Sequence, residues 1–338
     1  MSFLTTAARC AVLLLVAGTW AILPAQEAAA SKFKDLKAQK ESGLISKAVG
    51  KKLNYFESKY FTWCTSKSEG VLKKVIKHAD KAYQVFAKDA KITGTRRLWG
   101  DQKAMICIFA NKSDFKRYVR WYSETYAVWS KQEFVKSHSN NDWFTEIQCR
   151  RVIACHLKPH DVDFIGQVVP NQIGFLAANR LHFHQNFCPP WFEESTAAWI
   201  EAKATGRLLC FTTRSNYGDS PFKVTDKPTE VFKKFMSGTK RGLKNGRFKN
   251  LKGLMKPRLG DLSYRDVQKG YAIIDWMRSQ PGKYSKFVRS MKRYWPSEIN
   301  TAFHKSQVTA QAKAFKAVFN MSLVEVDRAV KAHASKLK

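Results

Sequence analysis

Apolar residues are grouped along the chain in two ways, and each way predicts a different kind of element. Short apolar or β-branched runs between polar residues predict strands at 60–65, 104–110, 151–157 and 162–169. Longer segments in which apolar residues recur every three or four positions predict helices. The strand-like runs come early, and the later part of the chain carries mostly the helical spacing.

The first predicted helix follows the run at 60–65. Its apolar face comprises Val71, Leu72, Val75, Ile76, Ala79, Tyr83 and Phe86. Ser113 is placed to cap the next helix, because its hydroxyl can accept a hydrogen bond from an N–H of the first turn. That helix carries Phe115, Tyr118, Val119 and Tyr122 on one face. The polar stretch from Tyr126 to Asp142 is predicted to be irregular.

Two further helices are predicted from their ends. Pro170 and Asn171 precede a helix from about 172 to 187. Cys188-Pro-Pro190 stops that helix, because proline has no N–H to donate and clashes inside a helix. The second helix begins near Trp191 and ends at Gly206, a natural C-terminal stop.

The later part of the chain is predicted to be mostly helical. Residues 266–279 carry apolar residues on one face, and Ser322-Leu-Val-Glu325 is a capping box that opens another helix. Strands early and helices late predict an α+β fold. The expected divisions are a signal peptide at 1–30, a flexible basic lead-in at 31–52, an α/β half at 53–215, and a helical half of the same domain at 216–338.

The first thirty residues have the pattern of a secretory signal. A short start with one positive charge at Arg9 is followed by an apolar run from Cys10 to Leu23 and then by small residues. Cleavage after Ala25 and cleavage after Ala30 both fit. An uncleaved anchor is the alternative, although the run is shorter than the roughly 20 residues that span a membrane. The sequence therefore predicts an exported protein, periplasmic or extracellular, with no further transmembrane segment.

The net charge indicates which classes of partner the protein can bind, and the cysteine content indicates whether disulfides can form. The net charge of +32 draws a protein to polyanions such as nucleic acid, anionic lipid headgroups or acidic cell-wall polymers, and an acidic protein partner is equally allowed. Six cysteines follow the signal, and in an oxidising compartment they permit disulfides without fixing the pairing. They are Cys64, Cys107, Cys149, Cys155, Cys188 and Cys210. Cys107 lies in an apolar run and also fits a small core residue.

The basic charge is densest between Lys223 and Arg258, where twelve Lys or Arg face only two acidic residues. This stretch can bind a polyanion through charge alone. A helical hairpin with solvated basic faces is the alternative, and it is favoured over specific nucleic-acid recognition because positive charge is spread along the whole chain. The candidate binding residues are Lys240, Arg241, Lys244, Arg247 and Lys249.

The window from Asn179 to Glu201 reads NRLHFHQNFCPPWFEESTAAWIE. It resembles the paired helices of gluzincin-type zinc peptidases, particularly the bacterial peptidase MA-like families. Their pattern is His-Glu-x-x-His on one helix, a turn with proline and tryptophan, and a second helix that supplies a glutamate. The two histidines and that glutamate bind zinc, and the glutamate of the first motif is the general base for the attacking water.

The resemblance maps two motif positions onto His184 and Glu194, the remaining metal ligands. The first ligand position is Arg180, which stays cationic and repels Zn²⁺, and the base position is Leu181, which cannot accept a proton. A register shifted by two makes His182 the first ligand, but it then places phenylalanine and asparagine at the other positions. Neither register supports the peptidase mechanism.

Simpler interpretations of these residues exist. His182 and His184 are two apart, so they point away from each other on a helix. Glu193 and Glu194 lie in a first turn, where carboxylates favour the helix dipole, and Trp191 can serve only to set the angle between two helices. His156 and His160 have the motif's spacing, but the sequence between them lacks the glutamate and contains Pro159.

The resemblance covers most of the chain after the signal and implies a zincin-like core, which is a small mixed sheet with an active-site helix pair. The expected function is that of a non-catalytic, peptidase-like protein of the cell envelope that binds a peptide, a protein or a polyanion. His182, Trp191 and Glu193 are the candidates to line its cleft. One alternative is a zinc hydrolase that uses His182, His184, Glu193 or Glu194, and zinc is expected only in that case. The other is a polyanion-binding protein that uses the fold as a scaffold. Charge complementarity also predicts a salt bridge from Arg180 to Glu194.

Overall fold

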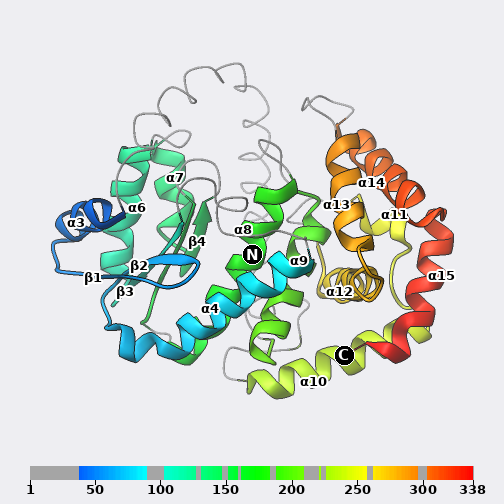
Figure 1. Cartoon of the computed structure of the whole chain (residues 1–338), viewed down its shortest axis with the longest axis horizontal. Coiled ribbons are helices and arrows are strands. Elements are labelled where there is room, and N and C mark those ends of the chain that lie inside the picture. The colour runs from blue at the N-terminus through cyan, green and yellow to red at the C-terminus, as the bar shows by residue number, and fades with distance from the viewer. Residues whose placement is uncertain are drawn as a thin grey trace, which may run out of the picture.

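The computed structural model contains a five-stranded mixed sheet and, later in the chain, a group of packed helices (Figure 1). The structure describes residues 38–89, 103–126, 131–146, 151–158, 161–182, 188–208, 221, 226–256, 262–295 and 303–337. The α+β class expected from the sequence is confirmed. The signal peptide expected at 1–30 lies outside the described residues.

The sheet has the strand order β1-β2-β3-β5-β4. Its strands are β1 (Asn54–Glu57), β2 (Phe61–Thr65), β3 (Ala104–Phe109), β4 (Trp143–Glu146) and β5 (Val152–His156). The three central strands are parallel, and β1 and β4 are antiparallel edges. Parallel strands covered on both faces carry continuous apolar runs, and such runs correctly predicted β2, β3 and β5.

Each face of the sheet packs against its own helices. Trp63, Ile106 and Ile153 belong to the core shared with α4 (Glu69–Asp89) and α8 (Val162–His182). Met105 and Ala154 point to the opposite face, where they meet α3 (Ala38–Val49) and α6 (Lys112–Tyr126). The alternation follows from the two-residue period of a strand.

The helical part completes the larger of the two cores. Its elements are α9 (Pro190–Thr205), α10 (Pro228–Lys244), α11 (Leu251–Leu254), α12 (Tyr264–Arg278), α13 (Lys283–Tyr294), α14 (Phe303–Phe319), α15 (Leu323–His333) and the 3₁₀ helix η4 (Ala334–Lys336). Figure 1 shows α4, α8 and α9 between the sheet and the helices α10 to α15. Gly206 ends α9 in the left-handed conformation, and Ser322 and Glu325 form the predicted capping box of α15.

The strand predicted at 162–169 is wrong, because α8 begins at Val162 and continues through Pro170. The helix predicted from about 172 therefore starts ten residues too late. Both errors have one cause. Nearly every residue of α8 is buried, so the helix is apolar all round and lacks the three-to-four spacing that distinguishes a surface helix from a buried strand.

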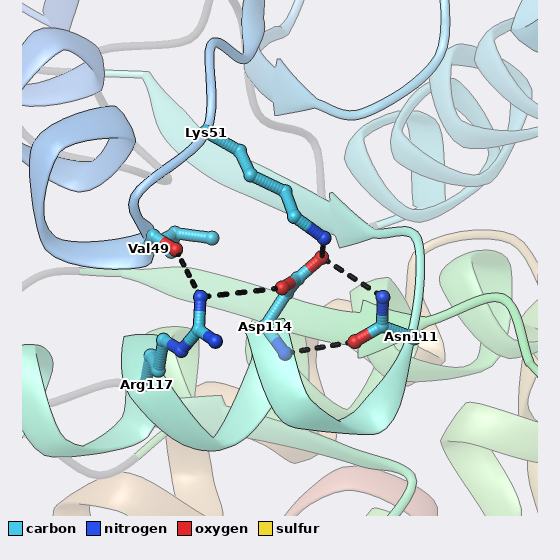
Figure 2. Close-up of polar contacts among 5 residues, drawn as sticks. All are labelled: Val49, Lys51, Asn111, Asp114 and Arg117. Atoms are coloured by element: carbon cyan, nitrogen blue, oxygen red, sulfur yellow. Dashed lines mark hydrogen bonds and ion pairs between the residues drawn. The ribbon is translucent and has the colours of Figure 1, made fainter.

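The stretch expected to be a flexible lead-in contains a packed helix instead. Ile45 and Val49 of α3 are fully buried against α6. At the junction, shown in Figure 2, Arg117 donates to the carbonyl oxygen of Val49 at 2.6 Å, and Lys51 pairs with Asp114 at 2.9 Å. Two apolar residues at helical spacing are enough to dock the helix, and the Lys-rich composition concealed them.

Three smaller expectations also change. The stretch from Tyr126 to Asp142, expected to be irregular, contains α7 (Lys131–His138), whose Phe134 is buried. The cap of α6 is Asn111 and not Ser113, since the Asn111 side chain accepts from the Asp114 N–H at 3.0 Å. Val71, expected on the apolar face of α4, is 52% exposed, because Leu72 next to it is the residue of the first turn that faces the core.

Candidate functional site

The helices α8 and α9, which carry the peptidase-like window, are packed closely together. A Cβ added at Gly174 of α8 would lie only 2.8 Å from the Cα of Ala197, so glycine is required where the two backbones approach. The contacts between the helices pair early residues of one with late residues of the other, and the two therefore run antiparallel.

Polar side chains join the two helices along their buried interface. Asn179 donates to the Glu193 carboxylate near one end of the interface. In the middle, the side-chain amide of Asn171 donates to Glu201 at 3.1 Å. At the other end the Thr205 hydroxyl donates to Gln167 at 3.1 Å. Buried polar groups need such partners, because an unmade hydrogen bond costs about 1–3 kcal/mol.

The predicted site residues fall into two groups. Arg180, Leu181 and His182 occupy the last turn of α8, but their side chains, and the whole of His184, lie outside what the structure describes. The residues contributed by α9 are buried, with Glu193 3% and Glu194 1% exposed. Trp191, expected to line a cleft, is also buried, and its indole N–H donates to Gln311 at 2.7 Å.

No group of three metal-ligating side chains occurs among the described residues. His184, one of the two predicted remaining ligands, lies outside the described residues. Whether the protein binds zinc therefore stays a prediction. His156, the first histidine of the other candidate spacing, lies in strand β5 and not on a helix. Its Nε2 is 3.2 Å from Asp142 and its ring is fully buried.

A polar cluster that the sequence did not predict lies where α9, α12 and α15 meet. The Asp275 carboxylate accepts from the Trp199 indole at 2.9 Å, and its other oxygen is 3.1 Å from Nε2 of His333. Lys203 is 3.6 Å from the same carboxylate. The α9 pair Trp199 and Lys203 is far in the sequence from Asp275 and from His333, and none of these residues belongs to a motif, so no sequence signal could have identified the cluster.

Arg278 lies beside this cluster, between two aromatic rings. Its guanidinium carbon is 4.0 Å from the ring centroid of Trp199 and 4.0 Å from that of Tyr284. Burial lowers the pKa of Arg278, while Tyr284 partly offsets that effect. Cation–π contacts of this kind are worth about 2 kcal/mol or more when desolvated, and here they hold α12 against α9 and α13.

Four of the six cysteines are described, and all four are free, buried thiols: Cys64, Cys107, Cys155 and Cys188. Cys64 and Cys107 face each other on β2 and β3. A hydrogen bond from the Cys107 thiol lowers the pKa of Cys64, and burial raises the pKa of Cys107. The expectation that Cys107 is a small core residue is confirmed, and Cys149 and Cys210 lie outside the described residues.

The five candidate polyanion-binding residues differ in whether they face solvent or form an ion pair. Lys240, Arg241 and Lys244 are exposed on one side of α10, and Arg247 is exposed just beyond it. Lys249 differs, because its ammonium is 2.8 Å from the buried Asp266 carboxylate at the start of α12. We therefore interpret Lys249 as a structural residue and not as a binding residue.

The sequence matches no protein-family model and no curated protein. Within the described part of the chain, no helix combines the length and the apolar character that a membrane crossing requires.

Proposed function

We propose that the protein is a non-catalytic relative of the gluzincin-type zinc peptidases, exported to the cell envelope or exterior, whose fold serves as a scaffold for binding. The order of the elements supports this proposal. A small mixed sheet with an antiparallel edge strand precedes two closely packed helices, α8 and α9, as the zincin-like core implied by the resemblance requires.

The observation that carries the proposal is the helical position of Leu181. α8 extends to His182, so Arg180 and Leu181 lie on the helix where the motif places its first ligand and its general base. An aliphatic side chain cannot accept a proton from water. The Asn179–Glu193 hydrogen bond joins α8 to α9 one residue away, and this contact links the two helices without a metal.

Arg180 and Glu194 each lie one residue beyond that contact. Because the helices run antiparallel, one step along each helix turns both positions towards the same side of the pair. From this placement we propose an ion pair between Arg180 and the carboxylate of Glu194, which is buried. We propose that this ion pair occupies the place of the lost zinc.

Zinc content and proteolysis test the proposal. We expect the purified protein to contain no stoichiometric zinc and to leave casein intact, whereas hydrolysis that a chelator abolishes would overturn the non-catalytic function. The double variant Arg180→His/Leu181→Glu restores the motif and is expected to bind one zinc ion through positions 180, 184 and 194.

A single variant protects this test against a folding failure. Arg180→His restores the third ligand but leaves Leu181 in place, so it is expected to bind zinc without hydrolysing casein. Circular dichroism shows whether each variant is folded. A folded Arg180→His variant that binds no zinc would refute the peptidase-like arrangement of the site.

The exposed basic side of α10 favours a second, compatible function, namely binding of a polyanion on this scaffold. Lys240, Arg241 and Lys244 recur at the spacing of a helical turn and face solvent. Binding by charge alone releases counterions and falls steeply with salt. Affinity that did not change between low and moderate salt would argue against this function.

A further inference from the structure

Exposed cations lie along α10 and just beyond its C-terminal end. We define the α10 surface as Lys234, Lys240, Arg241, Lys244 and Arg247, all of which are exposed. The opposite side of the helix is apolar and buried, with Val231 and Phe235 in the core. From Lys234 to Lys244 the surface extends about 15 Å, at a rise of about 1.5 Å per residue.

The described carboxylates near the α10 surface form their ion pairs with other cations. Glu230, the acidic residue of α10, pairs with Lys233 at the beginning of the helix. Lys249, just beyond the surface, pairs with Asp266. Among the described residues, no carboxylate forms an ion pair with any member of the α10 surface. Neighbouring cations one helical turn apart are about 5–6 Å from each other, and a linear polymer with regularly repeating anions complements such a row.

The described side chains around the α10 surface argue against two other classes of partner. Protein interfaces rely on aromatic or aliphatic anchors at their centre, and single-stranded nucleic acids rely on aromatic platforms for base stacking. Phe235 is fully buried, and Phe232 and Phe248 are packed against the core. Within the part of the chain that the structure describes, the α10 surface therefore offers charge without an exposed aromatic anchor.

We infer that the α10 surface binds an acidic polysaccharide, a linear chain of uronic-acid type recognised by its repeating carboxylates. This inference rests on the proposed function, because an exported scaffold encounters such polymers in the envelope. Lys and Arg both suit carboxylates, and Arg241 and Arg247 can each bind one in a bidentate manner.

The protein offers a matched control for this inference. The exposed side of α13 carries Lys286, Arg289, Lys292 and Arg293, which are two lysines and two arginines, like Lys240, Arg241, Lys244 and Arg247 of the α10 surface. We define these four as the α13 surface. α13 packs on α14 and α12, whereas α10 packs on α12 and α15, and Figure 1 shows the two helices in different parts of the helical group.

The experiment compares two quadruple variants with equal net charge. One changes Lys240, Arg241, Lys244 and Arg247 to Gln, and the other changes the four residues of the α13 surface to Gln. Binding of the full chain to sodium alginate is measured by isothermal titration at several salt concentrations. We expect the α10 variant to bind about tenfold or more weakly at 0.1 M salt. Its salt dependence should lose about one unit of slope for each cation that had contacted the polymer.

The outcomes separate the possible explanations. The α13 variant is expected to stay within about threefold of the unmodified protein, since its charges act only through the long-range field. Equal losses in the two variants would show that net charge alone drives binding and would overturn the inference. Tighter binding of duplex DNA than of alginate, with the same dependence on α10, would overturn the choice of polysaccharide.

Failure here is distinguishable from failure of the proposed function. Zinc binding by the Arg180→His variant and the casein assay report on α8 and α9 alone. A protein that passes those tests but does not bind alginate is a non-catalytic scaffold with a different partner. A protein that hydrolyses casein and still binds alginate through α10 retains the binding surface on an active enzyme.

Discussion

His78 on α4 lies with its Nδ1 atom 3.2 Å from the carbonyl oxygen of Gly166 on α8. That carbonyl has no donor within its own helix, because the residue four positions later is Pro170. The His78 ring therefore supplies the missing hydrogen bond, with Nδ1 as the donor. One side chain on a neighbouring helix thus allows a proline-containing helix to continue without a break.

This contact predicts a pH dependence of stability. Burial lowers the pKa of His78, and nearby Lys74, Arg207 and Lys81 lower it further, against the opposing effect of the Gly166 hydrogen bond. The folded-state pKa is thus below the unfolded value of about 6.5. The unfolded chain then binds more protons as the pH falls, so the contribution is complete above about pH 6.5 and is lost below it.

Urea unfolding at pH 7.5 and at pH 5.5 measures this effect. The His78→Gln variant should lose less stability between the two pH values than the unmodified protein does. His138→Gln should act in the same direction, because burial also lowers the pKa of His138, on a different helix. An unchanged loss in the His78 variant would contradict the assignment.

Gly270 is predicted to be required for close packing where α12 crosses α9. A Cβ there would lie 1.9 Å from the Ser195 hydroxyl oxygen and 2.9 Å from the Ser195 Cβ. Gly270→Ala should therefore push the helices apart and reduce the free energy of unfolding by about 1–3 kcal/mol. Gly43→Ala in α3 is the matched control, because no atom lies within 4 Å of a Cβ added at Gly43. This substitution should stabilise the protein by about 0.5–1 kcal/mol, since alanine favours a helix more than glycine does. Chemical denaturation of both variants decides the matter.

Asp114 is predicted to contribute more than an ordinary surface carboxylate. Its side chain is 3% exposed and lies between Lys51 at 2.9 Å and Arg117 at 3.8 Å. Asp114→Asn should cost about 1–2 kcal/mol, because the charge-assisted hydrogen bonds to a buried group are weakened. The control is Asp163→Asn. Asp163 also lies in the first turn of a helix, and this substitution disrupts its exposed ion pair with Lys74. It should stay within about 0.5 kcal/mol, and equal costs in thermal denaturation would refute the prediction.

A double-mutant cycle tests the proposed ion pair between Arg180 and Glu194. The single variants Arg180→Gln and Glu194→Gln and the double variant should reveal a coupling of about 1–3 kcal/mol, since Glu194 is buried. The same cycle on the exposed Lys74–Asp163 pair should give about 0.5 kcal/mol or less. A coupling near zero at positions 180 and 194 would eliminate the pair.

Patterns among neighbouring residues correctly predicted the elements whose apolar and polar positions reflect which sides are buried and which are exposed. The buried runs of β2, β3 and β5, the spacing of α4, and the capping box at Ser322 all follow from neighbouring residues. The pattern failed at α8, where burial on every side removes the polar face that identifies a helix. It also failed at α3, whose two anchoring residues lie in a Lys-rich stretch.

The candidate site was predictable only in part, for a related physical reason. A motif reveals which residue types are absent, so Leu181 could be recognised in the base position from the sequence alone. It does not reveal which partners satisfy the buried groups. Asn179 and Glu193 are close enough in sequence to be paired by inspection, but Trp191 and Gln311 are 120 positions apart.

The contacts of α15 bear on the order in which the protein folds during synthesis. His333 and Asp327 reach back 58 positions to Asp275 and Lys269 of α12. A ribosome makes α12 well before α15. Asp275 can then already contact Trp199 and Lys203 of α9, but its contact with His333 and that of Lys269 with Asp327 have to come later. Contacts with such large sequence separation slow folding. The two contacts between α12 and α15 therefore form only after α15 has been made, and they place this part of the helical packing late in synthesis.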